Sequence, residues 1–135
     1  VKDPAASLQA VGPVFDITTV KEPWVANEEV VAYGAKLFNT NCAMCHGDKG
    51  LGDGPAGMAL NPRPRNLVEG KWTQGGGDIA HFKVITNGIP GTSMAAFGHF
   101  KVADRWAIVQ FVESITKNKS SDTPEQIAEF AKTAK

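Results

Sequence analysis

Two cysteines and a histidine in the first half of the chain have a spacing that suits covalent cofactor attachment. Cys42 and Cys45 are three positions apart, and His46 directly follows the second cysteine. In the C-x-x-C-H pattern the two thiolates reach the two vinyl groups of a porphyrin, and the histidine brings its imidazole to the iron. The motif therefore predicts one covalently attached haem c, held by Cys42 and Cys45, with His46 as an iron ligand.

Three other uses of a C-x-x-C pair are weighed against this one. A thioredoxin-like redox pair follows a strand in a βαβ unit, and no strand pattern precedes Cys42. A zinc site needs more ligands than the two cysteines of this chain, and would have to draw on His81 or His99. A disulfide between cysteines this close in sequence closes a strained loop. The five-residue pattern favours haem attachment, but it leaves these alternatives open.

The composition bounds the class of protein. The chain has 135 residues with 14 basic and 14 acidic side chains, so its formal net charge is zero. This balance argues against nucleic acid or an anionic membrane as the main partner. The length favours one domain, and no stretch is apolar enough for a transmembrane segment. Because haem c is normally attached outside the cytoplasm, we expect an exported, periplasmic protein whose signal peptide has been removed.

Two helical patterns lie on either side of the motif. The first is predicted to begin at an Asn27 N-cap, and it contains Gly34, which costs about 1 kcal/mol relative to alanine inside a helix. A second helix crossing too closely for a side chain would explain this glycine. The best partner is the helix predicted over 103–116. Its wide apolar face consists of Trp106, Ile108, Val109, Phe111, Val112 and Ile115.

The residues before the motif match a known register. Gly34 and Phe38 precede Cys42 by eight and four positions, and this arrangement resembles the N-terminal helix and haem motif of bacterial class I cytochromes c. The resemblance covers about residues 27–116. It implies an all-α cytochrome c fold in which the N- and C-terminal helices cross beside a buried covalent haem, with long irregular loops.

The glycine-rich segment 47–66 is expected to be a long loop that wraps the haem edge. Its proline-rich end resembles the family segment in which a proline-region carbonyl accepts the other imidazole N–H of the axial histidine. Pro64 is our candidate for this role, and Pro62 is the alternative. The candidates for hydrogen bonds to the haem propionates are Arg63, Arg65 and Trp72. The alternative for the two arginines is that their side chains are solvated and have no such role.

A short helix is predicted over 79–87, with Asp78 as its N-cap and Gly88 as its closing residue. Its apolar face is expected to pack on the porphyrin. This face consists of Ile79, Phe82 and Ile85.

The segment 88–97 resembles the family's distal-ligand loop, in which a methionine supplies the sixth iron ligand. This implies His46 and Met94 as the two axial ligands, a pair that suits low-spin iron in electron transfer. The family often has proline directly after the methionine, whereas this chain has Ala95. The rivals for the sixth position are Met44, Met58, His81 and His99.

The chain is expected to have three parts. Residues 1–26 form an extended arm with enough apolar side chains to lie on the domain surface, and residues 27–117 form the cytochrome c domain. Residues 118–135 form a linker and an additional helix. That helix begins with a capping box of Thr123 and Gln126.

These features predict a monohaem, single-electron carrier that is monomeric and has redox proteins as donor and acceptor. We expect it not to be an enzyme, because both axial positions are filled and no nucleophile–base constellation is evident. Two alternatives remain. One is a haem subunit of a larger extracytoplasmic oxidoreductase, and the other is a ligand-binding or sensory haem protein in which Met94 leaves the iron.

Overall fold

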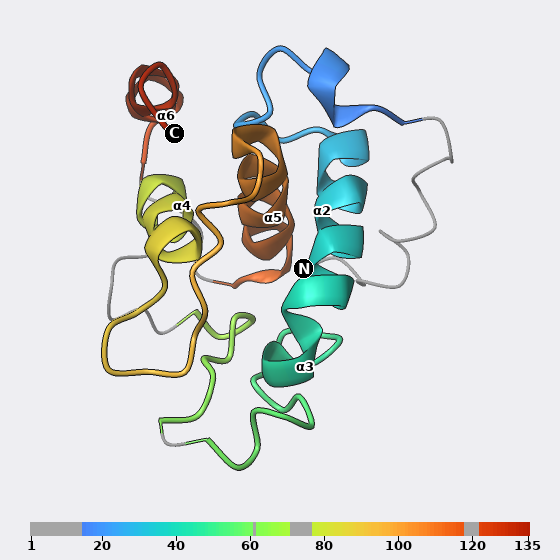
Figure 1. Ribbon diagram of the computed structural model, residues 1–135. Helices are drawn as coiled ribbons and strands as arrows, with labels where there is room; N and C mark the ends of the chain where they lie inside the picture. The colour runs from blue at the N-terminus through green and yellow to red at the C-terminus, as the bar shows by residue number, and fades with distance from the viewer. Residues whose placement is uncertain (1–14, 61, 71–76, 118–121) are drawn as a thin grey trace.

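The computed structural model describes residues 15–60, 62–70, 77–117 and 122–135, and these residues form helices and loops with no strand. Figure 1 shows the arrangement. The elements are η1 (Ile17–Thr19), α2 (Glu28–Asn41), α3 (Ala43–His46), α4 (Asp78–Asn87), α5 (Val102–Ile115) and α6 (Pro124–Ala131). The predicted all-α class is confirmed.

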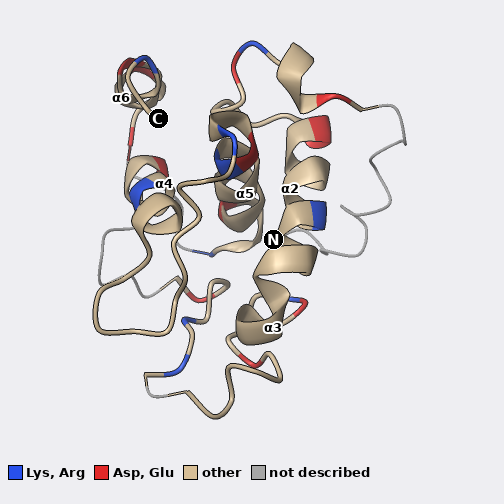
Figure 2. Cartoon of the chain, in the orientation of Figure 1, with Lys and Arg blue, Asp and Glu red and all other residues tan. Residues whose placement is uncertain are grey.

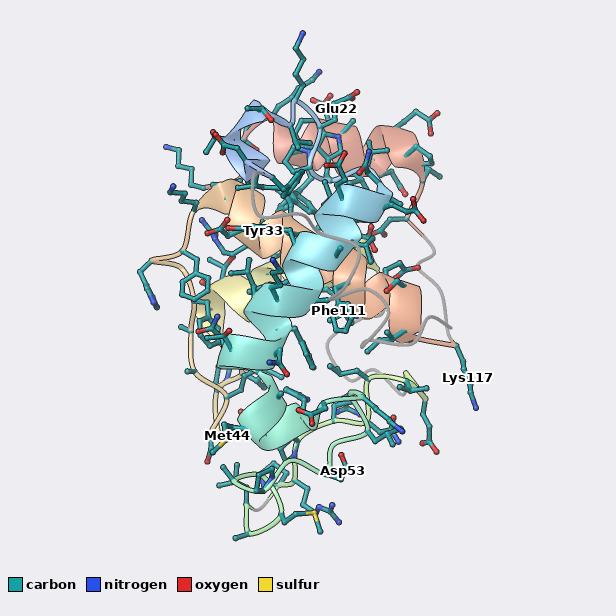
Figure 3. The ribbon with its side chains drawn as sticks, turned by 90° about the vertical axis from the view of Figure 1, so that its right-hand side faces the viewer. Glu22, Tyr33, Met44, Asp53, Phe111 and Lys117 are labelled. Carbon is teal, nitrogen blue, oxygen red and sulfur yellow. The ribbon has the colours of Figure 1, made fainter. Side chains whose placement is uncertain are left out.

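The centre of the fold is the crossing of α2 and α5 (Figure 1). A Cβ atom at Gly34 would overlap the carbonyl oxygen of Ala107, so the predicted close approach of two helices is confirmed. One turn along, the Phe38 and Phe111 rings pack with centroids 4.9 Å apart. Phe111 is labelled in Figure 3, beside the ribbon of α2. Because Gly34 has no side chain, the two backbones meet directly and the aromatic rings fill the space beside them.

The two crossing helices begin close to the predicted positions. The Asn27 side chain accepts hydrogen bonds from the amides of Glu29 and Val30, at 2.8 and 3.4 Å, as expected of an N-cap. Helix α5 begins one residue earlier than predicted. All six members of its predicted apolar face are buried: Trp106, Ile108, Val109, Phe111, Val112 and Ile115.

Helix α4 differs from its prediction at the N-cap. Its N-cap is Gly77, and Asp78 is instead the first helical residue, buried where its Oδ2 accepts a hydrogen bond from Gln110 Nε2 at 3.2 Å. Phe82 stacks on Trp106 at 4.3 Å between ring centroids, so this ring packs against α5. The expected packing of this face on a porphyrin stays a prediction. Gly88 closes the helix with a positive φ of 70°, although its ψ of −170° lies outside the left-handed helical region.

The segments outside the crossing pack onto it. Ile17 of η1 is buried with Val30 and Ala107, and Trp24 meets Trp106 edge-on. At the other end of the chain, Thr123 and Gln126 form the predicted capping box of α6. Its buried residue, Ile127, joins the main core.

None of the helices among the described residues has the length and apolar character required to span a bilayer. Figure 2, in which the chain is coloured by residue type, shows acidic and basic positions interspersed along the described residues. This distribution agrees with the balanced composition.

Candidate haem attachment site

The C-x-x-C-H motif forms one short helical turn at the end of α2. Cys42 ends α2, with its amide bonded to the Phe38 carbonyl at 2.8 Å, and α3 then covers the next four residues. The amide of His46 bonds to the carbonyl of Cys42 at 2.9 Å. The motif is therefore attached to the crossing helices through continuous helical hydrogen bonds.

The long loop that follows α3 donates hydrogen bonds to the carbonyl groups of this turn. Loop amides donate to the last three carbonyls of α3: Ala56 to Met44 at 2.8 Å, Gly54 to Cys45 at 3.1 Å and Gly52 to His46 at 2.7 Å. A Cβ at Gly54 would collide with the Met44 carbonyl, so only glycine allows this approach. The wrapped loop fixes the orientation of the turn that carries the three motif side chains.

The imidazole of His46 has a defined partner. Its Nδ1 lies 3.1 Å from the carbonyl oxygen of Arg65. A carbonyl can only accept, so Nδ1 carries the proton and Nε2 has a free lone pair. Desolvation lowers the pKa of His46, which favours the neutral ring that an iron requires. The acceptor was expected at Pro64 or Pro62, and the structure instead places it one residue beyond Pro64.

The direction of the loop carbonyls explains why Arg65, and not Pro64, accepts from His46. The Pro64 carbonyl faces Gly52, where an added Cβ would come within 2.6 Å of it. Successive carbonyls in an extended segment point in different directions, so the next carbonyl, that of Arg65, is directed at His46. The candidate role of the Arg65 side chain at a propionate is not tested by this contact, because only its backbone is involved.

The two cysteines are compatible with thioether attachment. Both are reduced and partly buried, with no disulfide between them. Burial, and then the neighbouring Cys45, raise the pKa of the Cys42 thiol to about 12. Two unpaired thiols and an imidazole with a free Nε2 on one short turn are the donor set that haem c requires, so the residues fit this cofactor.

Met94 lies on a loop whose backbone is held at several points. Its amide bonds to Thr92 Oγ1 at 3.2 Å, and the Phe97 amide bonds to the Ile85 carbonyl at 2.8 Å. A Cβ at Gly88 would approach the Met94 carbonyl to 2.7 Å, so the loop folds back on the end of α4. Figure 1 shows the α4–α5 loop and α3 extending toward the same end of the molecule. These contacts hold the loop backbone, although Ala95 stands where the family often has proline.

The rivals for the sixth ligand are placed differently. Met44 is 60% exposed on the motif turn itself, where Figure 3 labels it. Met58 is 53% exposed, and its sulfur accepts a hydrogen bond from Arg63 Nη2 at 2.8 Å. His99 is exposed beside Phe97, and His81 is buried on α4.

Trp72, a candidate propionate partner, lies outside the described residues.

Sequence reasoning did not predict the loop glycines whose amides bond to the motif carbonyls. Their signal was present in the series Gly47, Gly50, Gly52 and Gly54, which has the density expected where one backbone must approach another.

Comparisons with known proteins agree with this geometry. The family model for cytochrome c matches residues 31–116. The cbb3-type cytochrome c oxidase subunit FixP of Azorhizobium caulinodans is 40% identical over 65 residues, covering 48% of this chain and 20% of that protein. The corresponding subunit CcoP of Cereibacter sphaeroides is 32% identical over 97 residues, covering 66% of this chain and 31% of that protein.

A solved structure is also similar. A chain of the Kuenenia stuttgartiensis reducing HAO-like protein complex Kustc0457/Kustc0458 aligns with a TM-score of 0.65 and 25% identity, over 78% of this chain and 50% of that chain. The present chain thus spans a fifth to a third of the two curated relatives and half of the solved chain. On the family match and the motif geometry together, the chain belongs to the class I cytochrome c family, whose cofactor is covalently bound haem c.

Proposed function

We propose that this protein is a single-electron carrier whose low-spin haem is ligated by His46 and Met94. The observation that carries the proposal is the hydrogen bond from His46 Nδ1 to the Arg65 carbonyl, which leaves Nε2 available to the iron. A haem held by these residues would supply the redox change, through the ferric and ferrous states of its iron. The chain contributes by holding both ligands in position, so that electron transfer requires little rearrangement.

The side chains around His46 support this role. The Phe38 ring lies 6.3 Å from the imidazole between centroids and is itself buried against Phe111. This packing restricts rotation of the histidine ring and keeps water from that side. With both axial positions filled, we propose that the chain does not bind a substrate at the iron and is not itself an enzyme.

The ligand assignment is tested by the Met94→Ala variant. The oxidised wild-type protein should show the weak far-red absorption band of a methionine–iron(III) bond, and the variant should lose it. Met58→Ala is the matched control, because that methionine is exposed and contacts Arg63. If the band persists in Met94→Ala and disappears in Met58→Ala, the assignment of Met94 is wrong.

We also propose an extracytoplasmic location, with redox proteins as donor and acceptor. A fixed place in a larger oxidoreductase is the second candidate, and it is favoured by the names of the relatives, which are oxidase subunits. Light scattering and electron-transfer kinetics separate the two. A free carrier is expected to be monomeric and to exchange electrons with soluble donors at rates proportional to their concentration. Isolation in a stable stoichiometric complex with a catalytic subunit would favour the second candidate.

A further inference from the structure

A second group of potential metal ligands lies between α4 and α5. It consists of Asp78, His81 and Glu113, whose ligand atoms all lie within 4.8 Å of one another. Asp78 is 5% exposed and His81 is 7% exposed, so the group is built into the interior rather than scattered on the surface. None of these residues has a role in the haem site described above.

The two helices present these side chains to one another. Asp78 and His81 are three positions apart in the first turn of α4, and therefore share a face of that helix. Glu113 belongs to the last turn of α5, which packs against α4. Gln110, three positions before Glu113 on α5, donates to Asp78 Oδ2 at 3.2 Å and orients that carboxylate. Ligands on rigid helices with such an outer partner are typical of a built metal site.

We propose that Asp78, His81 and Glu113 bind one first-row divalent cation, with Zn²⁺ as the best-suited ion. One imidazole nitrogen and two carboxylate oxygens form a donor set that suits zinc, and the two carboxylates match the charge of the cation. Zinc–ligand distances of about 2.0–2.2 Å place neighbouring ligand atoms at roughly 3.3 Å in a tetrahedral site. Small side-chain rotations within the 4.8 Å group reach this spacing.

The electrostatics of the group agree with the proposal. Burial, followed by the nearby Glu113, raises the pKa of Asp78 to about 7, because a buried carboxylate next to a second carboxylate is harder to ionise. Burial lowers the pKa of His81 to about 4, which favours the neutral ring, the form of histidine that binds metals.

Asp122 is a further acidic residue near this group of ligands. Its Oδ2 accepts the hydrogen bond of the Ile79 amide at 3.1 Å, which offsets the positive end of α4 next to the site. Glu113 is half-buried, so the cation has an approach from solvent at the end of α5. A metal bound here would connect the first turn of α4 to α5. The loop that carries Met94 follows the other end of α4.

The test uses the haem-loaded protein, freed of adventitious metal with a chelator that is then removed. Isothermal titration with Zn²⁺ alone is expected to show one saturable site, and elemental analysis one zinc per haem iron. His81→Gln and Asp78→Asn should each weaken zinc binding by about 100-fold or more, since each removes a direct ligand. His99→Gln is the matched control, because that histidine is exposed and should leave binding unchanged.

The haem absorption spectrum and far-UV circular dichroism report whether each variant is folded. Glu113→Gln, at the half-buried position, provides a second test if His81→Gln does not fold. The proposal is overturned if the wild type binds no zinc saturably, which would mean that the carboxylates share only a proton. It is equally overturned if His99→Gln abolishes binding while the variants of the group retain it. Neither result depends on which residue is the sixth iron ligand.

Discussion

At the scale of single residues, one backbone oxygen determines how His46 can act. Because the Arg65 carbonyl accepts from Nδ1, the ring is held in the tautomer whose Nε2 is unprotonated. The lowered pKa keeps that nitrogen free of a competing proton. Coordination of an iron therefore requires neither a change of tautomer nor a rotation of the ring away from its partner.

Tyr33 provides a residue-scale prediction, because it is the one tyrosine of the chain. Its hydroxyl donates to Asp104 Oδ1 at 2.8 Å, and burial, then this bond, raise its pKa from 10.0 to about 12. The folded state thus retains a proton that the unfolded chain releases between these pH values. The free energy of unfolding should be unaffected below pH 10 and should fall as the pH rises from 10 toward 12.

The phenolate absorption in difference spectra measures this titration directly. The folded wild type should ionise about two pH units above the unfolded chain, and Asp104→Asn should bring the midpoint closer to 10 because it removes the negative charge. Tyr33→Phe should eliminate the spectral change and cost about 1 kcal/mol near pH 7, the usual net value of one hydrogen bond. A phenolate that forms near pH 10 in the folded wild type would contradict the assignment.

Residue types and spacing pointed to Cys42, Cys45 and His46 as a group, and the structure places them on one short helical turn. Their attachment to a haem stays a prediction. Residue types and spacing did not identify the Arg65 carbonyl, since every residue has one and only the loop's backbone angles decide which carbonyl faces the imidazole. The roles of Pro64, the Arg65 side chain, Trp72 and Met94 toward a haem stay predictions.

At the scale of elements, local signals predicted helix starts well. The caps at Asn27 and Thr123 depend on neighbours within three residues, and both formed as expected. Asp78 has the same sequence signal, but its carboxylate bonds to Gln110, 32 residues away in the chain. A tertiary partner of this kind leaves no trace in the local sequence.

The crossing of α2 and α5 predicts a large effect of Gly34→Ala. Alanine would favour the isolated helix by about 1 kcal/mol. Its Cβ would, however, overlap the Ala107 carbonyl, which is backbone and cannot rotate away. We expect the helices to move apart and the free energy of unfolding, measured by urea denaturation, to fall by about 2 kcal/mol or more.

Gly98→Ala is the control for this substitution. Its added Cβ would approach the Thr86 carbonyl only to 3.1 Å, a contact that a small displacement relieves. A loss well below that of Gly34→Ala is therefore expected. Equal losses in the two variants would mean that the close approach of α2 and α5 does not determine stability.

At the scale of the whole molecule, two segments outside the helix crossing complete the core. Ile17 covers the Val30–Ala107 contact, while α6 covers the aromatic rings of α4 and α5. The apolar side chains of the arm predicted that it would lie on the domain, and Ile17 does so. Their contacts were not predictable, because a pattern of apolar residues indicates burial but not the surface that buries them.

Arg105 connects these parts from inside. It is 2% exposed, and its guanidinium lies 5.0 Å from the centre of the Phe82 ring. It donates to Thr86 Oγ1 and to the Lys135 carbonyl, each at 2.8 Å. One buried cation therefore joins α4, α5 and the residues after α6.

The contribution of α6 is tested by Phe130→Ala. The Phe130 ring meets Phe82 at 5.6 Å and Trp106 at 6.0 Å, each edge-on. Removing this half-buried ring should lower the free energy of unfolding by about 1–3 kcal/mol, less than for a fully buried phenylalanine. Lys132→Ala is the control on the same segment, because its ion pair with Glu129 at 2.9 Å is exposed to solvent and should contribute at most about 0.5 kcal/mol. If both variants unfold at the wild-type urea concentration, α6 does not stabilise the aromatic core, and the packing of Phe130 on Phe82 adds nothing to the fold.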